Sequence, residues 1–324
     1  MNTSRPIITM QDVDLEFSPG TGVFDMHMAV NSGTIFGLIG PSGCGKTTTV
    51  RLLTGLHAPQ RGVVRVLDDT PHRFKTRSRK AIGYVTQQFV LYPNLTVGEN
   101  LNFAASIYGV GYFSRRKRLR EVLDFVELRD AQHRLGNKLS GGMQRRLSLA
   151  CALVHNPRLL FADEPTAGID PVLRAKFWEH FRQLRDEGRT LFITTQYIGE
   201  AVYCDLVGVM REGRLLHVDT PDNLRRKALG GETIKVGVPP EQSFEAVRRF
   251  TSHQAFQEVR RVPRAPGELY LTVEESGAAM PLVFETMRID PEITVLHAEP
   301  YVPPFDDVFI ALMEQSANTY SNPT

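Results

Sequence analysis

The stretch GTIFGLIGPSGCGKTTTVRLLTGL, residues 33–56, decides the fold of most of the chain. Its apolar start at residues 33–39 predicts a buried strand, and residues 48–56 predict a helix. Between them, residues 40–47 read Gly-x-x-x-x-Gly-Lys-Thr, which predicts a phosphate-binding loop at a helix N-terminus. Lys46 can reach the outer phosphates of a nucleotide, and the Thr47 hydroxyl can ligate Mg²⁺. A glycine-rich turn with a chance lysine is the alternative interpretation.

The length, charge, cysteine content and apolar runs of the chain indicate what kind of protein it is. A chain of 324 residues suggests two domains, and a formal charge of +2 gives no signal for nucleic acid as a partner. The three cysteines form neither a disulfide framework nor a metal-binding spacing, which fits a reducing compartment. No apolar run approaches the ~18 residues that span a bilayer, and the first residues lack the apolar centre of a signal peptide. We therefore expect a cytoplasmic protein that needs a partner for any role at a membrane.

The order of predicted strands and helices changes near residue 225. Up to that point strand-like and helix-like segments alternate, which predicts an α/β domain with a largely parallel sheet. Beyond it the order β-α-β-β-α-β predicts a small ferredoxin-like α+β domain at residues 226–316. The segments expected in that order are residues 233–238, 241–251, 256–262, 269–273, 278–287 and 293–298. The small, polar residues 317–324 are expected to be a frayed tail.

Two acids end an apolar run at residues 159–164 (LLFADE). A buried strand that delivers a carboxylate to its carboxyl end suits a Mg²⁺ site facing the phosphate-binding loop. Asp163 would then hold the metal, and Glu164 could polarise an attacking water as general base. An acidic pair that caps the next helix is the alternative for the two residues taken alone.

A second potential anion site lies at residues 139–144 (LSGGMQ). Ser140 is a suitable helix N-cap, and Gly141 and Gly142 leave their N–H groups open. An ordinary capped helix start explains the same residues equally well.

Together these motifs, followed by Ala167, Gly168, Ile169 and Asp170, resemble an ABC transporter ATP-binding subunit over residues 7–225. The resemblance implies a P-loop ATPase domain, with a RecA-like core and a helical subdomain at about residues 88–155. It also implies ATP and Mg²⁺ as ligands. Ser140, Gly141 and Gly142 resemble the family's signature, so each complete site would use the phosphate-binding loop of one chain and the signature of a second, in a homodimer or heterodimer.

The resemblance assigns further roles residue by residue. Phe17 would stack on adenine, with a core strand residue as the alternative. Gln87, rather than Gln88, would ligand Mg²⁺ and sense the γ-phosphate. The residues implied to contact the nucleotide or its metal are Phe17, Gly40, Pro41, Ser42, Gly43, Cys44, Gly45, Lys46, Thr47, Thr48, Gln87, Ser140, Gly141, Gly142, Asp163 and Asp170. Thr47, Gln87 and Asp163 are the metal ligands among them.

One position departs from the commonest family pattern. Gln196 follows the strand at residues 190–195, where most members carry a switch histidine. Glutamine can donate a hydrogen bond to a γ-phosphate oxygen but cannot take up a proton. Glu164 would then be the one general base, and Gln196 and Gln87 would assist catalysis through hydrogen bonds. The departure at Gln196 therefore bears on the rate of hydrolysis more than on ATP binding.

The branch of the family is indicated by LSGGMQRRLSLA at residues 139–150 and FDDVFIAL at residues 305–312. Both resemble daunorubicin-resistance-type exporter subunits. The resemblance implies export of a drug, antibiotic, lipid or similar substrate through a membrane-spanning permease that docks on residues 91–101, at the inner face of the cell membrane. A soluble non-transport ABC ATPase and a hydrolysis-poor regulatory subunit of a heterodimer are the alternatives.

A basic run, Arg115, Lys117, Arg118 and Arg120, precedes Glu121 and Asp124. We interpret it as a solvated helix face. Contact with phospholipid headgroups or RNA is the alternative.

Overall fold

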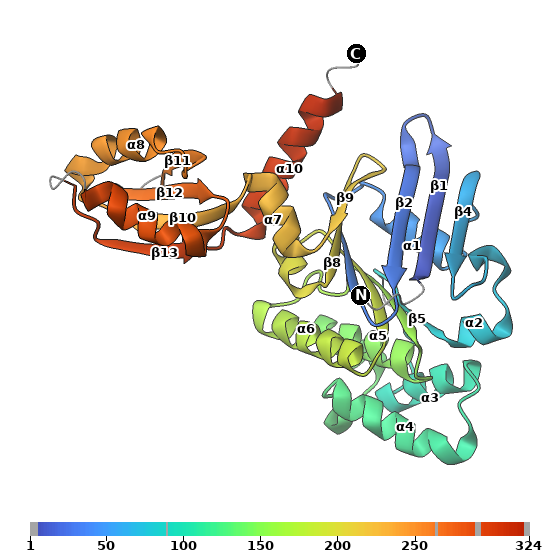
Figure 1. Ribbon diagram of the computed structural model, residues 1–324. Coiled ribbons are helices and arrows are strands. Elements are labelled where there is room, and N and C mark those ends of the chain that lie inside the picture. The colour runs from blue at the N-terminus through green and yellow to red at the C-terminus, as the bar shows by residue number, and fades with distance from the viewer. Residues whose placement is uncertain (1–5, 89, 263–264, 289–292, 321–324) are drawn as a thin grey trace. The chain divides into compact units, whose positions relative to one another are not determined.

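The computed structural model of the chain describes residues 6–88, 90–262, 265–288 and 293–320 (Figure 1). The chain forms two compact units, Met1–Asp219 and Thr220–Thr324. The division precedes helix α7 (Pro221–Leu229), which packs on α10 (Phe305–Tyr320) of its own unit. No helix in the described part of the chain is long and apolar enough to cross a membrane.

A six-stranded sheet forms the centre of the first unit, in the order β5-β6-β7-β3-β8-β9. Its strands are parallel except β9, which pairs antiparallel with β8. Every residue of β3, β6 and β7 is buried, as expected for parallel strands covered on both faces. Because their carboxyl ends meet at one edge, the residues that follow these strands lie close together. The strands are β3 (Ile35–Ile39), β5 (Ile82–Val85), β6 (Leu159–Asp163), β7 (Thr190–Thr195), β8 (Leu206–Arg211) and β9 (Arg214–Asp219).

An antiparallel sheet of β1 (Pro6–Ser18), β2 (Thr21–Asn31) and β4 (Arg61–Val66) completes the β-structure of this unit, in the order β2-β1-β4. Burial alternates along the second half of β2, so one face of the sheet is apolar. That face shares a hydrophobic core with Phe36, Phe161 and Phe192 of the parallel sheet.

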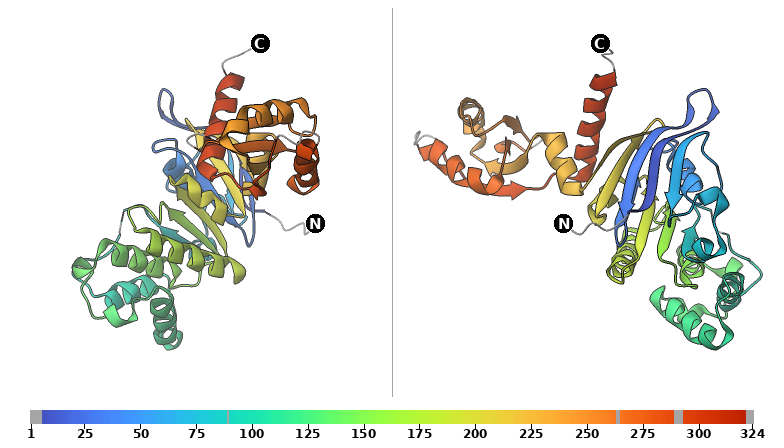
Figure 2. Two further views of the ribbon diagram at one scale, coloured as in Figure 1. Left: turned by 90° about the vertical axis from the view of Figure 1, so that its left-hand side faces the viewer. Right: turned by 45° about the vertical axis from the view of Figure 1, so that its right-hand side comes forward.

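Helices α3 and α4 lie in the region expected to be a helical subdomain, and both pack against α5. The views in Figures 1 and 2 agree in placing α3 and α4 at the end of the unit away from the β1–β2 turn. A capping box between Thr96 and Glu99 begins α3. The helices of the unit are α1 (Lys46–Leu53), α2 (Thr76–Lys80), α3 (Val97–Ile107), α4 (Tyr112–Phe125), α5 (Gly141–Leu153) and α6 (Pro171–Asp186). Short 3-10 turns are η1 (Pro71–Arg73), η2 (Arg129–Ala131), η3 (Gly136–Lys138) and η4 (Ile198–Tyr203).

The second unit contains an antiparallel sheet in the order β11-β12-β10-β13. With α8 and α9 between the strands, this is the β-α-β-β-α-β order of a ferredoxin-like domain. It has its own core, which includes Ile234, Phe250 and Leu271. The elements are β10 (Glu232–Gly237), η5 (Pro240–Gln242), α8 (Ser243–Ser252), β11 (Glu258–Arg261), β12 (Glu268–Val273), α9 (Ser276–Arg288) and β13 (His297–Tyr301).

Two details of this unit differ from the sequence expectation. The last strand was expected at residues 293–298 but occupies His297–Tyr301, where it pairs with β10. Ile293 is buried in the core although it precedes the strand, so its apolar character reports burial and not strand position. The expected frayed tail at residues 317–324 is helical as far as Tyr320, and residues 321–324 lie outside the described part.

Candidate nucleotide-binding site

The phosphate loop, residues 40–47, joins β3 to α1 as a tight backbone curl. Gly45 caps α1 with a left-handed φ of 109°, and a Cβ there would lie 2.6 Å from the Met210 methyl carbon. Only glycine meets both constraints. Pro41, Ser42 and Gly43 are exposed, Thr47 and Thr48 are half-buried, and Cys44 is buried. Burial raises the pKa of the Cys44 thiol, so only the backbone of this residue is offered to an anion.

Lys46 is buried at the first position of α1. Its Nζ donates to the carbonyl oxygens of Gly40 and Pro41, at 2.8 and 3.0 Å, and lies 3.7 Å from Glu164 Oε1. The ammonium group is therefore held over the loop by two carbonyl acceptors, and a phosphate oxygen could accept from the same donor. This places a positive charge beside the carboxylate that ends the neighbouring strand.

Asp163, the last residue of β6, is 1% exposed. Its Oδ1 accepts hydrogen bonds from Thr194 Oγ1 at 2.5 Å and Thr47 Oγ1 at 3.3 Å. A hydroxyl and a carboxylate thus meet at the edge of the sheet, where β3, β6 and β7 end. Hard oxygen donors of this kind are the ligands that Mg²⁺ prefers, so the residues present fit that ion.

Glu164 has a left-handed φ of 49°, which is uncommon outside glycine. Its backbone N–H donates to the carbonyl and hydroxyl oxygens of Thr194, at 3.1 and 3.0 Å, and these bonds fix the turn. Its Oε2 accepts a hydrogen bond from Gln87 Nε2 at 3.1 Å. The side chain thereby lies between Gln87 and Lys46, and the hydrogen bonds to Thr194 maintain the strained backbone conformation that places it there.

Arg145 is a site residue that the sequence analysis missed. It lies on α5 and is 5% exposed, and its Nη1 donates to the carbonyl oxygens of Thr86 and Gln87 at 3.2 and 3.1 Å. Desolvation lowers the pKa of Arg145, whereas the charges of Glu164 and Asp163 raise it. Its only sequence signal was the basic pair in LSGGMQRR, which gives no hint of the Gln87 loop as its partner.

Gln196 follows β7 directly and is exposed. Behind it lies a second missed residue, Glu200, which is 3% exposed. Glu200 Oε2 accepts from Thr195 Oγ1 at 2.6 Å and from Thr166 Oγ1 at 3.0 Å, and its Oε1 lies 3.6 Å from Arg174 Nε. Glu200 thus ties the strand end before Gln196 to the segment that follows Glu164.

The signature, Ser140 with Gly141 and Gly142, begins α5. Ser140 is the N-cap and accepts from the Met143 N–H at 3.3 Å, while a Cβ at Gly142 would lie 2.8 Å from Leu173 Cδ2. Leu173 belongs to the first turn of α6, which Asp170 caps at 3.0 Å. Signature and Asp170 therefore lie together. Within the described part of the chain, no hydrogen bond or ion pair joins either to the phosphate loop.

Phe17, near the end of β1, is 54% exposed. Its ring meets the His57 ring edge-on, with 5.4 Å between centroids. The side chain is not a core strand residue, and its exposed ring can offer a π-face to a flat ligand.

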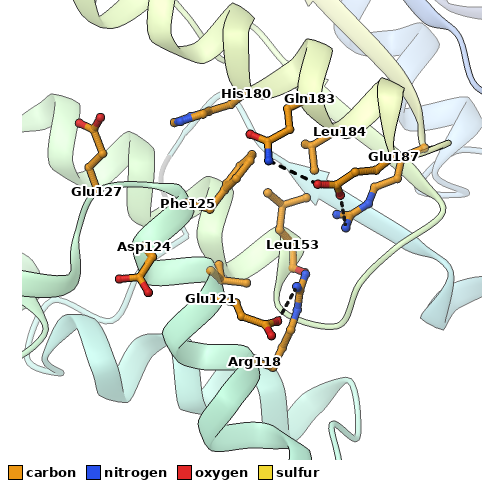
Figure 3. Close-up of a pocket in the computed structure, with 12 residues that line it drawn as sticks. Arg118, Glu121, Asp124, Phe125, Glu127, Leu153, His180, Gln183, Leu184 and Glu187 are labelled. Carbon is orange, nitrogen blue, oxygen red and sulfur yellow. Dashed lines mark hydrogen bonds and ion pairs between the residues drawn. The ribbon is translucent and has the colours of Figure 1, made fainter.

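A cavity of about 640 Å³ lies elsewhere in the first unit, between α4, α5 and α6 (Figure 3). Its wall includes Phe125, Leu153 and His180, with charged side chains around them. None of the predicted nucleotide contacts lines it. This cavity is therefore separate from the candidate site at the strand ends.

Comparison with known proteins identifies the family of the chain. The ABC transporter family matches residues 23–167. The chain is 35% identical over 226 residues to the probable multidrug ABC transporter ATP-binding protein YbhF of Escherichia coli (strain K12), a match that covers 70% of this chain and 39% of YbhF. It is 34% identical over 229 residues to the linearmycin resistance ATP-binding protein LnrL of Bacillus subtilis (strain 168), covering 70% and 73% of the two chains. It thus spans well under half of YbhF but most of LnrL.

Among solved structures, a dimeric ATP-binding cassette in a post-hydrolysis state with ADP and Pi superposes with a TM-score of 0.60. That match has 26% identity and covers 66% of this chain and 98% of the other. The strand-end site, the matched segment and these relatives lead to one assignment. The chain belongs to the family of ABC transporter ATP-binding subunits.

Proposed function

We propose that this chain binds and hydrolyses ATP to power an ABC-type exporter of a drug, antibiotic, lipid or similar substrate. The observation that carries the proposal is the convergence of Lys46, Thr47, Asp163 and Glu164 at one sheet edge. The names of the relatives, which refer to multidrug transport and linearmycin resistance, support the exporter branch.

The chemistry follows from the side chains. Lys46 neutralises charge on the outer phosphates, and the open N–H groups of the phosphate loop bind their oxygens. Glu164 takes the proton of the attacking water, because its carboxylate is oriented by Gln87. Gln196 donates a hydrogen bond to the γ-phosphate.

Thr47, Asp163 and Gln87 are the residues that would hold Mg²⁺. When bound, the ion supplies positive charge against the phosphate oxygens. Asp163 already accepts a hydrogen bond from the Thr47 hydroxyl, so these two proposed metal ligands lie next to each other.

We propose that the complete site needs two chains. Ser140, Gly141 and Gly142, with Asp170 beside them, would bind the γ-phosphate of ATP held by the phosphate loop of a second subunit. ATP then favours the closed dimer, and hydrolysis releases it. The Gln87 loop and residues 91–101 would pass this motion to a membrane permease, which would hold the chain at the inner face of the membrane.

A second candidate function follows from Gln196. A site with a glutamine at the switch could bind ATP and hydrolyse it slowly, as a regulatory subunit of a heterodimer would. Measured turnover separates the two, since the exporter motor must hydrolyse ATP at a rate that ATP-dependent transport requires.

The test uses two site variants and a matched control. We expect Glu164→Gln to trap an ATP-bound dimer in size-exclusion chromatography and Lys46→Ala to abolish ATPase activity. Glu179→Gln, an exposed acid on α6, should behave like the wild type. Unchanged ATPase rates in both site variants would refute the site assignment. Recovery with ribosomes instead of a membrane protein would refute the transport role.

A further inference from the structure

The basic run on α4 consists of two groups with different surroundings. Arg115 and Arg118 turn toward the protein: Arg115 bonds the Val110 carbonyl and the Ser106 hydroxyl, and Arg118 bonds the carbonyls of Leu153 and Val154. Figure 3 shows Arg118 beside Leu153 and paired with Glu121. These two arginines are structural, so the expected solvated face is only part of the run.

The other two residues of the run, Lys117 and Arg120, belong to one exposed stripe, together with Tyr112, Phe113 and Arg116. Their spacing of three and four residues places them along one side of the helix. Phe113 is 99% exposed and Tyr112 is 84% exposed. In the described structure neither Arg116 nor Arg120 has an ion-pair or hydrogen-bond partner, and Lys117 lies 3.9 Å from Glu121. We call these five residues the α4 stripe.

The surroundings of the α4 stripe are also basic and apolar. No acidic residue occurs in the sequence between Glu99 and Glu121. Ile107, the last residue of α3, is 65% exposed, and the Lys80 side chain reaches the α3–α4 turn beside Gly109. Two neighbouring exposed rings with unpaired cations next to them form a surface that fits a partner both apolar and anionic.

We propose that the α4 stripe binds the anionic phospholipid surface of a membrane. The Phe113 and Tyr112 rings suit the boundary between headgroups and acyl chains, and the cations suit the negative surface potential beside it. RNA is a poorer fit, because the chain carries a net charge of only +2 and a single short stripe contacts few backbone phosphates. The contact is weak and reversible, since few residues make it.

This inference does not depend on the proposed transport role, because vesicles without permease test it. The full chain should float with vesicles of phosphatidylcholine and phosphatidylglycerol, but not with phosphatidylcholine alone, and salt should weaken the binding. Arg116→Ala with Lys117→Ala should reduce binding roughly 25-fold, at about five-fold per cation. Phe113→Ser should reduce it without changing the preference for anionic lipid.

The matched control is Arg65→Ala with Arg73→Ala, two exposed arginines on β4 and η1. The control should bind as the wild type does, and all variants should keep the ATPase rate of the wild type. Equal loss in control and stripe variants, or no binding to anionic vesicles, would overturn the proposal. The proposal would also fail if the wild type bound labelled single-stranded RNA in an anisotropy assay, the stripe variants lost that binding, and the same variants still floated with anionic vesicles as the wild type does.

Discussion

Arg145→Met is the variant that most directly tests how the site is held. The side chain is buried, and its guanidinium donates to the carbonyls of Thr86 and Gln87. Hydrogen bonds from a charged donor contribute ~1.5–3 kcal/mol each. Methionine fills much of the same volume but cannot donate. Because Gln87 is exposed and its carbonyl can rehydrate, we expect a total loss of about 2–3 kcal/mol in unfolding free energy.

The catalytic effect should exceed what the stability loss explains. Without Arg145 the Gln87 backbone is no longer anchored to α5, and the Gln87–Glu164 hydrogen bond depends on that anchor. If the proposed base loses about 1.4 kcal/mol of transition-state stabilisation through poorer positioning, kcat falls about ten-fold. KM for ATP should change little, since Arg145 does not touch the phosphate loop in the described contacts.

The neighbouring residue supplies the control. Arg146 Nη1 contacts the Val126 carbonyl and Glu127 at 3.3–3.4 Å, away from the Gln87 loop. Arg146→Met should therefore lose stability by about 1–2 kcal/mol and keep its kcat. Trp178, the single tryptophan, is buried on α6 and reports urea unfolding of this unit by fluorescence. Equal kcat for the two variants, measured where both are folded, would refute the anchoring role.

Three further predictions concern buried polar groups. Glu200→Gln keeps the size of the side chain but removes the negative charge that faces Arg174, and it should lower kcat several-fold. A wild-type rate would show that the contacts of Glu200 serve only packing. Burial lowers the pKa of His155 to about 4, so its folded form stays neutral while the unfolded chain gains a proton below pH 6.5. Stability should therefore fall between pH 6.5 and 4 by at most about 3 kcal/mol, and by roughly 1–2 after discounting partial exposure. His155→Phe should flatten that part of the pH profile of urea unfolding, and an unchanged slope would contradict the assignment. The Cys44 thiol should react with a maleimide at pH 8 far more slowly in the folded protein than in denaturant; equal rates would contradict its burial.

The sequence predicted those parts of the site whose chemistry is local. The phosphate loop fixes its own geometry within eight residues, and Asp163 and Glu164 are placed by the end of a buried strand. A parallel sheet brings such ends together whatever the loops between them contain. The strand expected at 233–238 was placed within one residue, because its short apolar pattern is also a local signal.

The residues that were missed are those whose partners are distant in sequence. Arg145 bonds carbonyls 58 and 59 positions away, and Glu200 bonds Thr166 across 34 positions. Arg145 lies in the LSGGMQRR motif, but the motif does not name its partner, and Glu200 is a single acid with no motif around it. The last strand was misplaced because Ile293 is buried without belonging to it.

The switch position can be judged against these contacts. The carboxylate of Glu164 is held by Gln87, and its backbone is fixed by Thr194, so no described hydrogen bond from Gln196 is needed to orient it. A histidine at this position would add a group that can take up a proton, and glutamine removes only that capacity. We infer that the substitution leaves the geometry of the proposed base intact and confines the role of Gln196 to a hydrogen bond. If Glu164 is the base, as we propose, the proton of the attacking water goes to it, and hydrolysis then depends on the anchoring of Gln87 by Arg145.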